Sequence, residues 1–201
     1  HKKEGDGPMK NTSPAKFRLL PYQALAKQWL WPAMWLIPGG IFLWWIAPDL
    51  TLFDERYAFA GLGVAGVGAL IVIYTFMARR AHVSCHKNNF VIHTPFYPVA
   101  FSYQCVEIIR PMDFKSIFPP EQEKSARRRL YKDIWGKTVV VINTKGYPLP
   151  LWWMRLWFHP YLIHPRERAL VLPVEDWMGL SRSLETLRTN WYEAQRQRRQ
   201  A

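Results

Sequence analysis

The chain has 201 residues, enough for one ordinary domain with a small addition, and it carries a formal net charge of +12. Its eleven Trp, eleven Phe and nine Tyr make up 15% of the residues, and such rings concentrate at membrane–water boundaries. The two cysteines, Cys85 and Cys105, are too few for a disulfide framework. This composition excludes a disulfide-stapled secreted domain and favours a protein at a membrane.

Two uncharged segments, residues 28–47 and 57–78, are each long enough to cross a hydrocarbon core of about 30 Å as a helix. A pair of buried core helices is the alternative, but so small a domain could not surround two helices that are apolar on every face. The first segment is also longer than a signal-peptide core, and no small-residue cleavage site follows it. The sequence therefore predicts a transmembrane hairpin over residues 28–78.

The charges on either side of these segments predict their orientation. Residues 1–28 carry six Lys and Arg against two acids, and residues 79–201 carry twenty against ten. The linker 48–56 carries one Arg against three acids. Because Lys and Arg near membrane helices stay in the cytoplasm, both termini are expected there. The predicted parts are a cytoplasmic segment 1–27, the hairpin and a cytoplasmic domain 79–201.

Small residues in the second apolar segment predict a helix-packing face. Gly61, Ala65 and Ala69 are spaced four apart, so a helix places them on one smooth side. The expected partner of this face is the first helix or a neighbouring subunit. The glycines here also spell G-x-G-x-x-G, but a dinucleotide site needs a preceding strand and a βαβ unit, which the sequence lacks.

Aromatic residues predict contacts with the membrane boundary at two places. Trp44 and Trp45 lie near the end of the first apolar segment, as in an aromatic belt. The tract 150–161 contains Trp152, Trp153 and Trp157, which we also assign to the interface.

After Arg80 the pattern changes to short alternating runs that are typical of strands. The expected strands are 82–86, 90–94, 99–103, 106–110, 139–143 and 169–174, whereas 148–163 is ambiguous between strands and interfacial loops. An amphipathic helix is predicted over 175–200, with Glu175 and Asp176 at its start. The predicted class is an α+β membrane protein with a mainly antiparallel β domain and a C-terminal helix.

This order of elements resembles the bacterial pleckstrin-homology membrane proteins. The resemblance rests on VSCHKNNFVIHTPFYPVAFSYQCVEIIRP, on the spacing of Ser102, Tyr103, Val106 and Ile109 within it, and on LVLPVEDWMGLSRSL near the end. It covers residues 25–195 and departs from the family pattern in a basic insertion at 111–136 and in the aromatic tract. The resemblance implies a PH-like domain, the bacterial cytoplasmic membrane, and scaffolding or membrane-associated regulation.

No motif for catalysis or for a cofactor stands out, so we expect a non-enzyme with no catalytic residue, cofactor or metal. The chain has no G-x-S-x-G, P-loop or H-E-x-x-H motif. His82, Cys85 and His86 are close in sequence, but on a strand the two histidines point to one face and Cys85 to the other. A metal- or cofactor-binding protein is therefore the weakest of the functional alternatives.

Clustered cations suggest a second kind of partner. Arg79 and Arg80 follow the second apolar segment, and Arg127, Arg128 and Arg129 form a basic run. They could contact anionic lipid head groups, although a topological surplus of positive charge explains them equally well. Nucleic acid is not expected, because no reading element accompanies the charges.

The function predicted first is that of an accessory or scaffolding subunit, which contacts the lipid bilayer and other membrane-protein subunits. An anionic-lipid-binding regulatory module is the alternative.

Overall fold

The structure, a computed structural model, describes residues 15–46 and 55–200. Most of the predicted linker 48–56 and much of the segment 1–27 lie outside these residues. The α-helices are α1 (Leu20–Ile46), α2 (Glu55–Arg79), α3 (Phe114–Ile117), α4 (Ser125–Leu130), α5 (Leu151–Trp157) and α6 (Trp177–Gln200). The strands are β1 (Lys16–Arg18), β2 (His82–Cys85), β3 (Asn89–His93), β4 (Pro98–Ser102), β5 (Val106–Asp113), β6 (Thr138–Thr144) and β7 (Ala169–Leu172). The chain is thus α+β, with two apolar helices, antiparallel sheets and a C-terminal helix.

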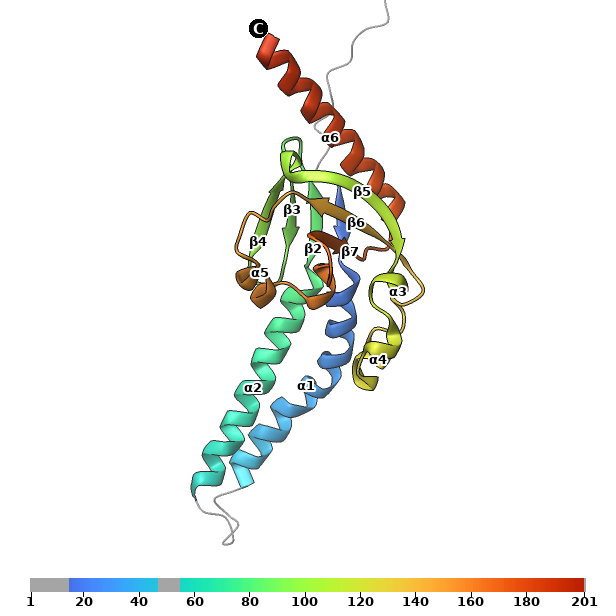
Figure 1. Cartoon of the computed structure of the whole chain (residues 1–201). Coiled ribbons are helices and arrows are strands. Elements are labelled where there is room, and N and C mark those ends of the chain that lie inside the picture. Colours follow the sequence, from blue (N-terminus) through green and yellow to red (C-terminus); the bar gives the residue numbers. More distant parts are fainter. Residues whose placement is uncertain (1–14, 47–54, 201) are drawn as a thin grey trace, which may run out of the picture.

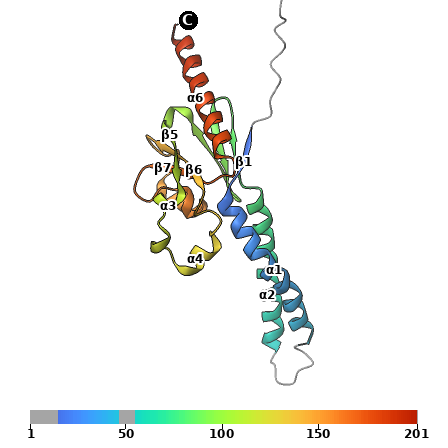
Figure 2. The same cartoon turned by 90° about the vertical axis from the view of Figure 1, so that its right-hand side faces the viewer.

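Helices α1 and α2 form an antiparallel pair that extends from one end of the sheet domain (Figures 1 and 2). Both are long and apolar enough to cross a membrane. Helix α1 begins at Leu20, earlier than the apolar segment, because its first turns are part of the domain. Tyr22 and Ala26 are buried there, whereas the side chains of Trp31 and Trp45 are exposed.

Two antiparallel sheets make up the domain. Sheet A has the order β1-β2-β3-β4, and the second sheet has the order β5-β6-β7. In sheet A, β1 pairs with β2 through Lys16 and Ser84, Phe17 and Val83, and Arg18 and His82. The hairpin is therefore an insertion between the first two strands of one sheet. Within the segment 1–27, which was predicted to be separate, Lys16–Arg18 thus form a strand of the domain.

The cores lie between and beside the sheets, where the alternating strand pattern places the apolar side chains. Val83, Cys85, Phe90 and Ile92 from sheet A pack with Val140, Ile142, Leu170 and Leu172 from the second sheet. Leu180 and Leu184 of α6 are buried in the same core. A second cluster surrounds Phe114, Tyr131 and Tyr161 and includes Leu20 and Leu25 of α1 among its partly buried members. The beginning of α1 is consequently held by the domain interior.

Helix α6 closes one side of this core and then projects beyond the domain, away from the hairpin (Figure 1). Asp176 caps its start, since its Oδ1 accepts a hydrogen bond of 2.8 Å from the Gly179 N–H. The ambiguous tract 148–163 forms α5 and a short 3-10 turn at Pro160–Leu162. The insertion at 111–136 forms the end of β5, α3, a 3-10 turn and α4.

Candidate functional site

The two apolar helices cross at a contact built from glycines. A Cβ atom added to Gly40 would lie 2.6 Å from the backbone nitrogen of Ala65 and 2.6 Å from the carbonyl oxygen of Gly61. One added to Gly61 would lie 2.8 Å from the Gly40 carbonyl oxygen. The backbones touch here, so no larger residue fits without separating the helices. The predicted residues Gly61 and Ala65 thus face α1; Ala69 is half-buried, and Gly68 is the residue that meets Leu36 and Ile37 one turn further along.

Other glycines of the hairpin face outward. An added Cβ at Gly39, Gly63 or Gly66 would meet no described heavy atom within 4 Å. Helix α2 therefore carries glycines on two faces, one occupied by α1 and the other open. The sequence pattern alone did not separate these two sets.

The predicted interface aromatics lie in two regions. Trp44 and Trp45 are 47% and 71% exposed on the half of α1 furthest from the domain. Trp152 is 67% exposed on α5, which lies beside the end of α2 that meets the domain (Figure 1). A row of contacting aromatic rings connects α2 to α5. The Tyr74 and Phe96 ring centroids are 5.5 Å apart, and those of Phe96 and Trp157 are 5.6 Å apart. Trp153 continues this row, 5.8 Å from Trp157 and 5.4 Å from Trp152.

The candidate arginines do not act as one group. Arg79 and Arg80 are exposed at the end of α2, and the Arg80 guanidinium lies 5.0 Å from the centre of the Phe76 ring. Arg127 turns toward Glu123, with 3.8 Å between its Nη1 and the carboxylate Oε2. Arg128 and Arg129 instead line an open groove. The basic run is divided because successive residues of α4 point in different directions.

We call this groove the basic groove; it is defined by Lys115, Pro120, Ser125, Arg128, Arg129, Lys132, Trp135 and Gly136. Its volume is about 570 Å³, and no described acidic side chain lines it. Trp135 is fixed at its edge, since the indole Nε1–H donates a hydrogen bond of 3.2 Å to the Arg128 carbonyl oxygen. Four cations beside an aromatic ring, with no acid among the described lining residues, can bind an anion. Lys115 and Lys132 also line the groove but were not predicted, because Lys115 lies 13 positions before Arg128 and Lys132 lies outside the continuous basic run.

A second hollow of about 470 Å³ lies between the 3-10 turn after α3 and the end of α5. Its lining is mostly apolar, and it contains both Glu123 and Arg155. Because the charges are of both signs, it lacks the electrostatic selectivity of the basic groove.

Three histidines gather on the outer face of sheet A. Ser84 Oγ lies 3.1 Å from His86 Nε2 and 3.1 Å from His93 Nε2, and the rings of His82 and His93 stack at 4.3 Å. Partial burial, followed by the neighbouring imidazoles, lowers the pKa of His93. Cys85 lies on the opposite face in the core, as strand alternation predicted. Among the described residues no group of three His, Cys, Asp or Glu side chains is arranged to hold a metal, and Ser84 is too buried to reach a substrate.

A buried network around His159 joins α1 to the domain. The His159 N–H donates to the Tyr22 hydroxyl at 3.0 Å, and the Tyr161 N–H donates to His159 Nδ1 at 3.2 Å. In the neutral ring the proton is therefore on Nε2, which lies 2.7 Å from the Tyr131 hydroxyl. Burial, and then the Arg127 guanidinium, lowers the pKa of His159 to about 4. The imidazole is thus a neutral structural link.

No protein-family model, curated protein or solved structure matches the chain. The functional argument therefore rests on the geometry of these sites.

Proposed function

We propose that the chain is a non-catalytic accessory subunit of a membrane protein complex, anchored in the bacterial cytoplasmic membrane by the α1–α2 hairpin. The observation that carries the subunit role is the open glycine face of α2. Gly63 and Gly66 remain open after α1 and α2 have packed together. Small residues on a lipid-facing surface allow another helix to approach closely, which favours association in a bilayer.

The membrane crossing is supported by the surface of the hairpin. Its large side chains, such as those of Trp31, Phe59 and Leu70, are exposed rather than packed in the protein. Because β1 and β2 pair directly, both ends of the hairpin must lie on the same side of any membrane that it crosses. The surplus of Lys and Arg at these ends favours the cytoplasm.

The joint between hairpin and domain supports a scaffolding role. Tyr22 and Ala26 of α1 are buried in the domain, and the His159 network holds the same turns. The domain therefore cannot swing freely on a linker. A subunit built in this way presents its cytoplasmic surfaces at a fixed height and angle.

The subunit role is tested by purification from native membranes in a mild detergent. The unaltered chain is expected to recover stoichiometric partners, and Gly63→Leu with Gly66→Leu is expected to lose them because both new side chains occupy the open face. Leu62→Val with Val67→Leu is the matched control, since these positions are already large and exposed. A lone monomer recovered with the unaltered chain would contradict the proposal.

Antiparallel strands closed by a C-terminal amphipathic helix support the resemblance to the bacterial pleckstrin-homology membrane proteins. Here the apolar hairpin is inserted after β1, so an isolated segment 79–201 would lack one strand of sheet A. Functional tests therefore require the full chain.

A second candidate function, binding of anionic lipid head groups, is favoured by the basic groove. Helix α4, which carries Arg128 and Arg129, lies beside the domain-proximal part of α1 (Figure 1). Each cation near an anionic leaflet contributes about 1 kcal/mol.

The lipid function is tested on the full chain in detergent with added phosphatidylglycerol or phosphatidylcholine. Native mass spectrometry counts the retained lipids. Arg128→Ala, Arg129→Ala and Lys132→Ala together are expected to reduce phosphatidylglycerol retention, most clearly at low salt. The control removes three charges from the end of α6, at Arg196, Arg198 and Arg199. Equal loss in both variants would show that net charge alone is responsible.

A further inference from the structure

The underside of the domain carries a continuous apolar patch beside the end of α2. We name it the aromatic ledge and define it by Phe96, Tyr97, Leu151, Trp152, Leu156 and Trp157. Trp152 is 67% exposed, Leu156 64% and Phe96 55%. Trp152 and Leu156 are four residues apart in α5, so they lie on the same face of that helix.

Elsewhere on the domain, large apolar side chains with such exposure occur singly. Ile108 on β5 and Met178 on α6 are examples, at 56% and 51%. Single exposed apolar residues are ordinary, whereas a contiguous patch marks a surface with a partner.

The ledge is held firmly by the fold. Met154 and Phe158 of the same tract are buried in the main core and fix α5 from its inner side. Thr94 orders the 94–97 turn, because its hydroxyl donates to the Tyr97 carbonyl oxygen at 2.6 Å and accepts from the Tyr97 N–H at 3.0 Å. The exposed rings are therefore a fixed surface and not a mobile loop tip.

The ledge continues the apolar surface of the hairpin. Phe96 stacks on Tyr74 of α2, with 28° between the ring planes, and the Trp157 ring centroid lies 5.6 Å from that of Phe96. Tyr74 lies five residues before Arg79, in the last apolar turns of α2. The row of rings thus leads sideways from the end of the membrane-crossing segment to α5.

We infer that the aromatic ledge rests in the head-group boundary of the bilayer that the hairpin crosses, as a membrane contact in addition to α1 and α2. This inference depends on the proposed membrane crossing, because the hairpin sets the height of the ledge. Trp and Tyr prefer this boundary, where one part of the ring meets hydrocarbon and the other meets water. The exposed Arg79 and Arg80 lie at the same end of α2, where anionic head groups would meet them.

Lipid is the occupant favoured by the ring types and by the contact with Tyr74. A second protein surface on the ledge is the competing occupant, and the experiment separates the two.

The test places spin labels on the full chain in nanodiscs that contain phosphatidylglycerol and phosphatidylcholine. The label is attached at Leu156→Cys with Cys105 replaced by Ala. Cys85 is left in place, because it is buried and its thiol pKa is raised to about 12 by desolvation. Power saturation then compares collisions with oxygen, which enters the bilayer, and with a water-soluble nickel chelate.

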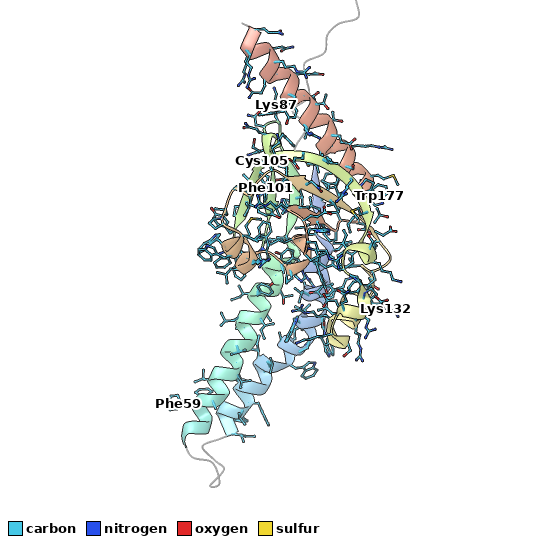
Figure 3. The ribbon with its side chains drawn as sticks, in the orientation of Figure 1. Phe59, Lys87, Phe101, Cys105, Lys132 and Trp177 are labelled. Carbon is cyan, nitrogen blue, oxygen red and sulfur yellow. The ribbon has the colours of Figure 1, made fainter. Side chains whose placement is uncertain are left out.

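Three reference positions calibrate the measurement. Leu70→Cys reports the hairpin surface, and Ile108→Cys reports an exposed apolar position on the cytoplasmic part of the domain. Native Cys105 gives a further aqueous reference, since Figure 3 shows it at the end of the sheet domain away from the hairpin.

The ratio of oxygen to nickel collisions is expected to be several-fold above one at Leu70→Cys and well below one at Ile108→Cys, and at Leu156→Cys it should lie between these two values, as a boundary position requires. A ratio at position 156 equal to that at position 108, with oxygen-dominated collisions at position 70, would overturn the ledge but leave the membrane crossing intact. Nickel-dominated collisions at both positions would overturn the proposed crossing itself. Low collision rates with both reagents at position 156 would assign the ledge to a protein partner and refute the lipid contact.

Discussion

The hairpin and the sheet domain distribute their large apolar side chains in opposite ways. In the hairpin, Trp31, Trp45, Phe59 and Leu70 are 67%, 71%, 73% and 67% exposed. In the domain, Phe90, Ile92, Ile142 and Leu170 are fully buried. The domain is therefore stabilised by removing apolar surface from water, whereas the hairpin is held by close contact of small residues. The aromatic ledge is the part of the domain whose surface follows the pattern of the hairpin.

The largest expected difference between the regions comes from the same residue type in the two settings. Phe90→Ala should destabilise the domain by about 3–5 kcal/mol, because it leaves a cavity beside Phe101 and Tyr103. Phe59→Ala should change stability little, since its ring is exposed and, in the proposed membrane crossing, would contact lipid or detergent in both the folded and unfolded hairpin. Thermal unfolding in detergent, followed by near-ultraviolet circular dichroism, measures both. Equal losses would contradict the comparison.

Neighbouring glycines of α1 test the second form of stabilisation. Gly40→Ala should cost about 3 kcal/mol, because its new Cβ meets the backbone of α2. Gly39→Ala has open space and should be neutral or slightly stabilising, since Ala favours helix over Gly. Thermal unfolding of the helical signal compares the two variants. A neutral Gly40→Ala would show that the helices do not cross where the structure places them.

The stability of the joint between the hairpin and the sheet domain should decrease in acid. His159 is neutral in the folded chain, with a pKa of about 4, whereas its pKa in the unfolded chain is about 6.5. Its contribution is therefore fully present above pH 6.5 and is lost as the pH falls toward 4, by about 3 kcal/mol in total.

The pKa values of His93 and His164 are also lowered, so these residues add to the acid response. The His159→Gln variant separates the effect of His159 from theirs. Unfolding is measured between pH 4 and pH 8 for both proteins. The variant should be less stable at neutral pH but should lose less stability on acidification. Parallel pH profiles of stability for the two proteins would contradict the predicted role of His159 in the acid response of the joint.

Much of the strand pattern could be predicted from the sequence, because period-two alternation places one set of side chains in the core. The pattern FVIHT gave β3 almost to its ends, and VVVIN gave the centre of β6. Strand β1 could not be found in this way, since its three residues, with only Phe17 partly buried, are too few for an alternating pattern to stand out. The tract around Trp152 was ambiguous because a seven-residue helix, with apolar side chains on both its buried and exposed faces, has no clear period.

The candidate sites required the tertiary structure for a related reason. Spacing alone placed Gly61 and Ala65 on one side of a helix, but only the position of α1 shows that Gly40 meets them. Lys115 joins Arg128 and Arg129 through the folding of the insertion, and His93 joins His86 across a strand pair. Contacts between segments that are distant in the sequence produce no local repeat of residue types from which they could be predicted.

The insertion of the hairpin between β1 and β2 also has a consequence for biosynthesis. Strand β1 emerges from the ribosome before either apolar helix, yet its partner β2 is made only after both. In the proposed membrane topology, sheet A can acquire β1 only once the chain has returned to the side of the membrane from which it started. Completion of sheet A would then require that both helices have inserted. A chain whose second helix failed to insert would keep β1 and β2 on opposite sides of the membrane, and sheet A would lack β1.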